Sequence, residues 1–169
     1  MIRLDKLLER SMLMDDAAWA RHASPWSVYT RIPIFPVLLA AIWSHTALGW
    51  WALIPIGIVI AWILINPHAF PPPTTTDTWA AKATFGERVW LNRGEIPIPS
   101  GHARAAFVLS LVAGVGAPIA LVAAYLNALG WTIAGAAICV LGKLWFCDRM
   151  VWLYEDMKDA SPTYAGWVR

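Results

Sequence analysis

Ionisable side chains gather where the last apolar segment of the chain ends. Residues 142–156 contain Lys143, the adjacent opposite charges Asp148 and Arg149, and Asp156. Ionisable groups close to hydrocarbon are costly and are usually paired with one another. These residues could therefore bind a polar ligand at the edge of an apolar region, or could simply neutralise one another.

A second pair of adjacent opposite charges, Glu87 and Arg88, lies in the middle of the chain. Neighbouring residues on a helix point about 100° apart and pair poorly with each other, so each needs a partner elsewhere. The sequence predicts a crossed arrangement, with Glu87 near Arg149 and with Arg88 near Asp148 or Asp156. The candidate polar cluster comprises Glu87, Arg88, Lys143, Asp148, Arg149 and Asp156. It could bind a lipid headgroup, a quinone or a small substrate, but we favour a structural ion-pair network beside an aromatic belt.

Histidine commonly binds metals, and the chain has four histidines. No two of them show the close spacing of a metal motif. His22, His68 and His102 lie outside the apolar segments on one side, and three converging imidazoles could hold zinc or iron. We expect instead that each is an ordinary interfacial histidine, and the sequence predicts no metal and no other cofactor.

Other catalytic chemistries find no supporting pattern of residues. Ser100 and His102 have no nucleophile elbow around them, and the chain has neither a Walker A sequence nor a dinucleotide-binding glycine pattern. Cys139 and Cys147 stand about 12 Å apart along a helix, too far for a disulfide. The net charge of +2 argues against nucleic acid as a partner.

The elements that position these residues follow from an apolar composition. The chain is 59% hydrophobic and 14% charged, whereas soluble domains carry about 25% charged residues. A soluble protein this apolar would have too little polar surface to cover itself, whereas lipid solvates an apolar exterior. Twelve tryptophans also suit the boundary between hydrocarbon and water. The composition predicts an integral membrane protein.

Two apolar blocks, residues 32–65 and 103–147, are each interrupted by a turn-like sequence. They predict an all-α membrane protein in which four transmembrane helices form two hairpins joined by a loop. The four helices are expected over residues 30–43, 48–65, 104–126 and 131–147. A span needs about 20 residues, so the first helix is short and residues 32–43 could re-enter rather than cross.

The positions of the basic residues predict the orientation. Neither hairpin turn holds a Lys or Arg, whereas both ends of the chain and the central loop hold several. Because basic segments stay in the cytoplasm, we expect a multi-pass protein of the cell membrane with both termini and the central loop cytoplasmic.

Two further patterns concern packing. Within residues 78–91, Trp79, Ala83, Gly86 and Trp90 share one stripe, which predicts an amphipathic helix on the inner membrane face or packed beneath the bundle. Residues 3–14 could form a weaker interfacial helix. Small residues recur at helical spacing in the third and fourth helices, which are therefore expected to pack tightly. These are Ala106, Ser110 and Gly114, then Gly116, Ala120 and Ala124, and finally Gly135 and Gly142.

Four stretches of the sequence carry a family resemblance: residues 19–31, with Trp19-Ala20-Arg21-His22; residues 66–72, Asn66-Pro67-His68-Ala69-Phe70-Pro71-Pro72; residues 85–93; and residues 142–156. The chain resembles an uncharacterised family of small prokaryotic membrane proteins, known as a domain of unknown function. The resemblance supports a membrane domain over residues 18–157. The basic residues place an N-terminal extension, residues 1–17, and a C-terminal tail, residues 158–169, in the cytoplasm. The resemblance implies no activity.

The function expected from these observations is non-catalytic, either as an accessory subunit or as a lipid-interacting scaffold. Its partners would be membrane lipids and either other membrane subunits or further copies of itself. The alternative is a membrane enzyme acting on a lipid or isoprenoid at the cytoplasmic face, using His22, His68, Glu87, Arg88, Asp148 and Arg149. A transporter is third, since four short helices enclose little volume without oligomerisation.

Overall fold

The computed structural model describes residues 15–169, and within that range the chain forms helices and no strands. The short helices α2 (Asp16–His22) and α3 (Pro25–Arg31) lead into a first hairpin. That hairpin consists of α4 (Ile34–Trp43), α5 (His45–Leu48), η1 (Gly49–Ala52) and α6 (Leu53–Ala69). Helix α7 (Trp79–Leu91) precedes a second hairpin of α8 (Ser100–Tyr125) and α9 (Leu129–Met157). The chain ends with η2 (Lys158–Ala160) and α10 (Pro162–Ala165). The interfacial helix expected over residues 3–14 and most of the N-terminal extension lie outside the described residues.

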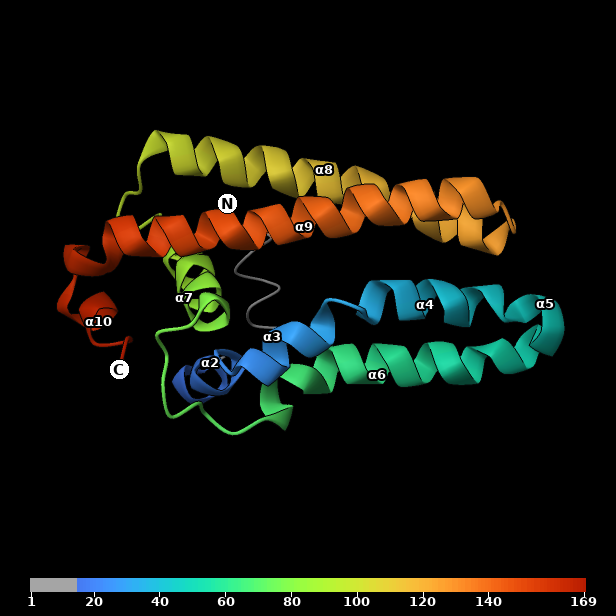
Figure 1. Cartoon of the computed structure of the whole chain (residues 1–169), viewed down its shortest axis with the longest axis horizontal. Coiled ribbons are helices and arrows are strands. Elements are labelled where there is room, and N and C mark those ends of the chain that lie inside the picture. The colour runs from blue at the N-terminus through green and yellow to red at the C-terminus, as the bar shows by residue number, and fades with distance from the viewer. Residues whose placement is uncertain (1–14) are drawn as a thin grey trace.

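The turns of the two hairpins lie at the same end of the molecule (Figure 1). We call this the turn end, and it comprises α5, η1 and the connection between α8 and α9. Helices α2, α7 and α10 lie at the opposite end, which we call the basic end. The two hairpins contact each other through α4, which packs against both α8 and α9. The expected pair of hairpins joined by a loop containing a helix is therefore present.

Three segments, not the predicted four, are long and apolar enough to cross a membrane: Pro25–Ala69, Ser100–Tyr125 and Leu129–Ala160. The first of these segments contains both arms of the first hairpin. Its first arm, α4, has only 10 residues, a rise of about 15 Å against about 30 Å of hydrocarbon. Pro33 and Pro36 cannot donate the backbone hydrogen bonds that would join α3 to α4. The residues directly before the expected first span therefore form the separate helix α3.

Helices α8 and α9 pack with almost no space between their backbones, as the small residues predicted. A Cβ on Gly116 would lie 2.5 Å from the backbone nitrogen of Cys139, and one on Gly135 would lie 2.6 Å from that of Ala120. Ala120 and Ala124 are fully buried. The other predicted row is only partly in the contact, because Ala106 is buried but Ser110 and Gly114 are exposed.

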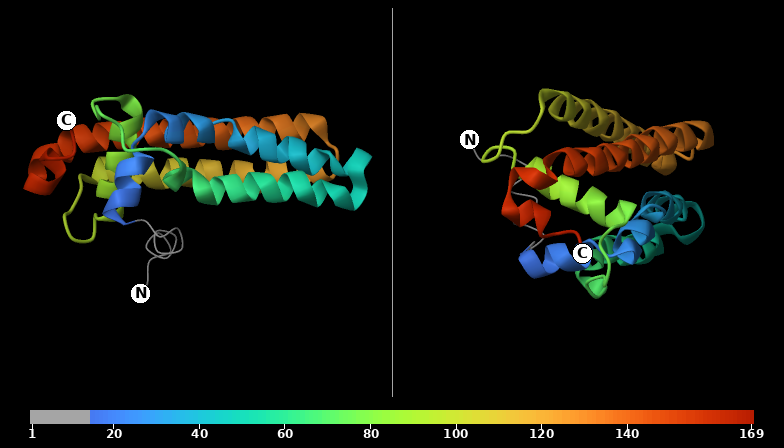
Figure 2. Two further views of the ribbon diagram at one scale, coloured as in Figure 1. Left: turned by 90° about the horizontal axis from the view of Figure 1, so that it is seen from below. Right: turned by 60° about the vertical axis from the view of Figure 1, so that its left-hand side comes forward.

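Helix α7 packs beneath the bundle, which is the second of the two expected placements. It lies between α9 on one side and α2 and α3 on the other (Figures 1 and 2). Seven of its 13 residues are buried. Its predicted stripe faces α9, because a Cβ on Gly86 would overlap the backbone carbonyl of Met150, and Trp90 meets Phe146 edge-on at 5.8 Å.

The residues after α9 fold back over the basic end and cover α7. Trp167 lies against Phe85, with ring centroids 5.6 Å apart, and against Tyr164 at 4.8 Å. The backbone of Thr76, which precedes α7, donates to the carbonyl of Arg169 at 2.9 Å. The hydrophobic core at this end therefore includes α7, α9 and the C-terminal segment.

Candidate functional site

The predicted crossed pairing between α7 and α9 is wrong. Glu87 pairs with Lys143, whose Nζ donates to Glu87 Oε1 at 3.5 Å. Arg149 lies over the Trp152 ring at 5.6 Å instead. The physical reason is the crossing point of the helices. Because Gly86 sits on Met150, the next residue, Glu87, faces the part of α9 that precedes Met150, where Lys143 is.

The remaining predicted cluster residues also lie apart from one another. Arg88 points to α2 and the C-terminal segment, where it pairs with Asp16 and lies over the Trp167 ring at 4.7 Å. Asp148 accepts a hydrogen bond from Trp79 Nε1 at 3.2 Å. Asp156 Oδ2 is 2.8 Å from His102 Nε2 on α8. Of the six predicted residues, only Glu87 and Lys143 pair with each other.

A different polar site forms around that pair, and three of its members, Arg31, Ser27 and Asn66, were not predicted. Arg31 at the end of α3 lies close enough to Glu87 to influence its charge, and Arg31 Nη2 is 2.9 Å from His22 Nε2. His22 Nδ1 is 3.2 Å from Ser27 Oγ. Ser27 donates to Asn66 Oδ1 at 2.9 Å. The polar site therefore joins α2, α3, α6, α7 and α9.

The hydrogen bonds of this site have only one consistent direction. Arg31 carries only donors, so His22 Nε2 must accept and the proton of its neutral ring must lie on Nδ1. Nδ1–H then donates to Ser27 Oγ, whose own proton goes to Asn66. Asn66 Nδ2 donates to Thr30 Oγ1 at 2.9 Å. Thr30 ends the chain of bonds by donating to the backbone carbonyl of Trp26 at 2.6 Å.

Burial and the Arg31 guanidinium lower the pKa of His22 to about 3. Protonation would put a charge on a ring that is 4% exposed and would leave Nε2 unable to accept from Arg31. His22 is therefore neutral throughout the physiological range of pH, and it is fixed as a donor to Ser27.

The charged members of the site do not balance. Burial alone would raise the pKa of Glu87, but the Lys143 ammonium and the Arg31 guanidinium outweigh burial and hold it below its usual value. Glu87 is thus ionised, and this one carboxylate pairs with Lys143 while Arg31 acts on it from a longer range. The pair is enclosed by helices but still accessible, since the side chains of Lys143 and Glu87 are 53% and 30% exposed.

Several buried donors at this end have no hydrogen-bond acceptor among the described residues. They are the Nε atoms of Arg21, Arg31 and Arg149. Buried donors in native proteins are rarely left unsatisfied. The uncompensated charge and the unused donors both favour an anion.

The three candidate metal-binding histidines do not come together. His22 belongs to the polar site, His102 pairs with Asp156, and His68 is exposed near the end of α6. The described part of the chain contains no group of three side chains placed to hold a metal ion.

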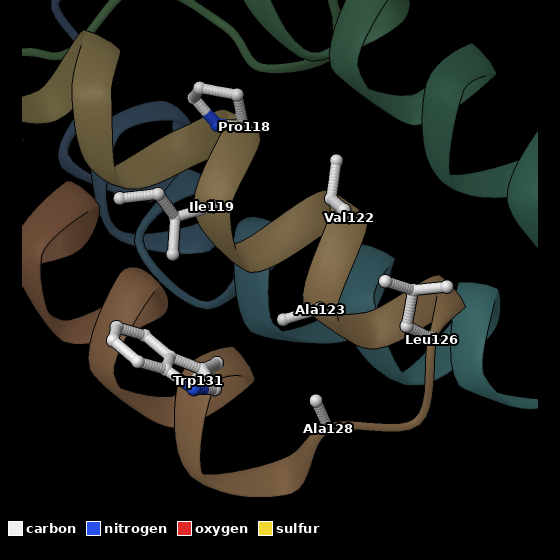
Figure 3. A pocket seen from close by; sticks show the side chains of 7 residues that line it. All are labelled: Pro118, Ile119, Val122, Ala123, Leu126, Ala128 and Trp131. Atoms are coloured by element: carbon white, nitrogen blue, oxygen red, sulfur yellow. The ribbon is translucent and has the colours of Figure 1, made fainter.

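A groove at the turn end has a different character. Its volume is about 460 Å³, and it lies beside α8 and the start of α9 (Figure 3). Its lining is apolar: Pro118, Ile119, Val122, Ala123, Leu126, Ala128 and Trp131. With no titratable side chain to use, this groove offers no chemistry.

The family model of a family of unknown function, DUF6653, matches residues 3–168. The chain belongs to this family. The expected relationship to a domain of unknown function is thus confirmed, and the match spans nearly the whole chain. No curated protein and no solved structure matches the chain. In this DUF6653 protein, the polar site at the basic end is the candidate functional site.

The depressed pKa of His22 predicts an acid-dependent stability. Between about pH 6.5 and pH 3 the unfolded chain binds a proton that folded His22 does not, so the free energy of unfolding falls as the pH falls. The contribution reaches about 1.4 kcal/mol per pH unit. Thermal unfolding in detergent from pH 7 to pH 4 should therefore show a shallower decline for His22→Gln than for the wild type.

The matched control is His68→Gln, which removes an exposed histidine and should keep the wild-type slope. Equal slopes for the wild type and His22→Gln would contradict a neutral, buried His22.

Proposed function

We propose that this chain is a multi-pass protein of the cell membrane that acts without catalysis, as a scaffold that binds lipid at its basic end. The three candidate spans support the membrane assignment. Large apolar side chains also cover the outside of the hairpins, among them Ile58 and Leu141, each 64% exposed. Lipid would solvate such a surface, whereas water would not.

The charge distribution supports an orientation with the basic end in the cytoplasm. Neither hairpin turn holds a Lys or Arg, whereas α2, α7 and the C-terminal segment hold several. Basic segments are retained on the cytoplasmic side. Both termini and α7 would then be cytoplasmic, and α5 and the α8–α9 connection would face outward.

Cysteine labelling tests this orientation. In a cysteine-free background, single cysteines at Thr46 and Asn127 should react with an impermeant thiol reagent in intact cells. Single cysteines at Thr75 and Thr163 should react only after lysis. Labelling of the Thr75 position in intact cells would refute the orientation.

The direction of the hydrogen bonds in the polar site is the observation that supports a non-catalytic function. A serine nucleophile needs a histidine that accepts its proton, but His22 donates to Ser27 and already accepts from Arg31. Glu87 is a weak base while two cations hold its pKa low. The alternative, an enzyme using His22, His68, Glu87, Arg88, Asp148 and Arg149, has less support because these side chains lie in separate contacts.

The lipid part of the proposal is supported by the position of the site. Lys143 belongs to a candidate span, and its ammonium reaches α7 at the basic end. A long basic side chain that leaves hydrocarbon in this way meets the headgroup region. The accessory-subunit form of the non-catalytic proposal would place a partner protein there instead.

Native mass spectrometry of the full chain in mild detergent tests the proposed function. We expect retained lipid without a stoichiometric metal or a fixed partner protein. About one zinc or iron per chain would favour the enzyme, and a stoichiometric partner protein without lipid would favour the accessory subunit. Either result would overturn the lipid scaffold.

A further inference from the structure

We propose that Arg31 and Lys143 form a binding site for a phosphate group, which in the membrane is the phosphate of a phospholipid. The inference rests on the proposed function for the source of the phosphate, but the site itself depends only on the residues of α3, α7 and α9. It specifies a ligand chemistry that the lipid-scaffold proposal leaves open.

The first argument is the charge of the site. Lys143 pairs with Glu87, Arg31 acts on the charge of Glu87 only from a longer range, and His22 adds no charge while it accepts a hydrogen bond from Arg31. No carboxylate in residues 15–169 lies within ion-pair distance of Arg31, whereas Lys143 is 3.5 Å from Glu87. Two partly dehydrated cations with one anion leave a net positive charge, which an anionic ligand would neutralise.

The second argument is the set of unused donors. A guanidinium has five N–H donors in a rigid plane, and it matches the geometry of phosphate oxygens. Within the described part of the chain, only Nη2 of Arg31 has an acceptor, namely His22. The Nε atom is buried without a partner. Lys143 adds an ammonium that is accessible from outside, because its side chain is 53% exposed.

The third argument is the depth of the site. Lys143 precedes Met150 by seven residues, about 10 Å along α9, and α7 crosses α9 at Met150. The Lys143 side chain spans part of this distance, because its ammonium meets Glu87 beside that crossing. The Lys143 ammonium is therefore displaced along α9 towards the basic end, where a phospholipid phosphate would lie if the hairpins cross the membrane.

Glu87 then has a definite role. When the site is empty, the Glu87 carboxylate pairs with Lys143 and offsets part of the positive charge of the site, so it competes with a phosphate for that charge. Replacing Glu87 should strengthen phosphate binding, whereas replacing Lys143 should weaken it. A purely structural ion pair predicts no such opposite effects on affinity.

The test measures ligand-induced thermal stabilisation of the full chain in nonionic detergent. Phosphatidylglycerol, a glycolipid with the same acyl chains and no phosphate, and sodium phosphate are titrated separately. We expect phosphatidylglycerol to bind about tenfold more tightly than the glycolipid. Lys143→Gln should weaken phosphatidylglycerol binding about tenfold, and Glu87→Gln should strengthen it about threefold or more.

Lys158→Gln is the matched control. It removes a lysine from an exposed pair with Glu155 at 2.9 Å, so phosphatidylglycerol affinity should stay within about twofold of the wild type. Arg31→Lys serves as a second variant that keeps the charge and loses the planar donors. It should weaken phosphatidylglycerol binding even if Arg31→Gln fails to fold.

The outcomes separate the two proposals. Equal binding of phosphatidylglycerol and glycolipid, unchanged in the variants, would overturn the phosphate site and leave the lipid scaffold standing. Stabilisation by sodium phosphate with the same pattern of variants, and none by either lipid, would support the phosphate site and overturn the lipid scaffold. Weaker phosphatidylglycerol binding by Glu87→Gln would overturn the competing role of Glu87 and with it this site.

Discussion

The permanent positive charge of Arg31 lies against a buried imidazole, and this contact orders the polar interior of the basic end. Because the guanidinium can only donate, His22 must accept, and every later hydrogen bond then has a fixed direction. The bonds cross from α2 to α3 and from α3 to α6. Thr84 on α7 also donates to the backbone carbonyl of His22 at 3.5 Å. The consecutive helices α2 and α3 are thereby held to α6 and α7, which come later in the chain, by one set of directional contacts.

The position of α7 is set by a different constraint, the absence of a side chain at Gly86. The backbone of α7 approaches Met150 so closely that no Cβ would fit. This contact decides which side chains of α7 meet α9 and which face α2. Glu87 is therefore brought to Lys143, and Arg88 is turned towards Asp16 and Trp167. The steric fit of α7 against α9 therefore decides which charged side chains pair with each other.

Hydropathy and turn composition suffice to predict much of the fold. The helix expected over residues 104–126 corresponds to Ser100–Tyr125, and the small residues between α8 and α9 correctly indicate their close packing. The first helix is shorter than the expected residues 30–43. Hydropathy does not register that Pro33 and Pro36 cannot donate the backbone hydrogen bonds that would join α4 to the residues before it. The placement of α7 remained open, since a stripe such as Trp79 and Trp90 fits lipid and a neighbouring helix equally well.

The polar site was harder to predict. Ser27 and Asn66 are small neutral side chains 39 residues apart, and neither has a motif around it. In the sequence, Arg31 contributes to the predicted orientation as one basic residue among many, and nothing marks it as a site residue. Lys143 and Glu87 were included in the candidate cluster, but pairing charges requires the rotation of each helix about its own axis. A signal was present in Asn66, because an amide at the end of an apolar helix needs a partner if it is buried.

Nitrogen-15 nuclear magnetic resonance of histidine-labelled protein in detergent tests the central claim most directly. The chemical shifts of the two ring nitrogens distinguish the neutral tautomers from the imidazolium. From pH 7 to about pH 4.5, His22 should remain neutral with its proton on Nδ1, because burial and Arg31 hold its pKa at about 3. The His22 resonances are identified as those that are missing from the spectrum of His22→Gln. A proton on Nε2, or an imidazolium at pH 6, would contradict the direction of the hydrogen bonds from which the charge of the site is derived.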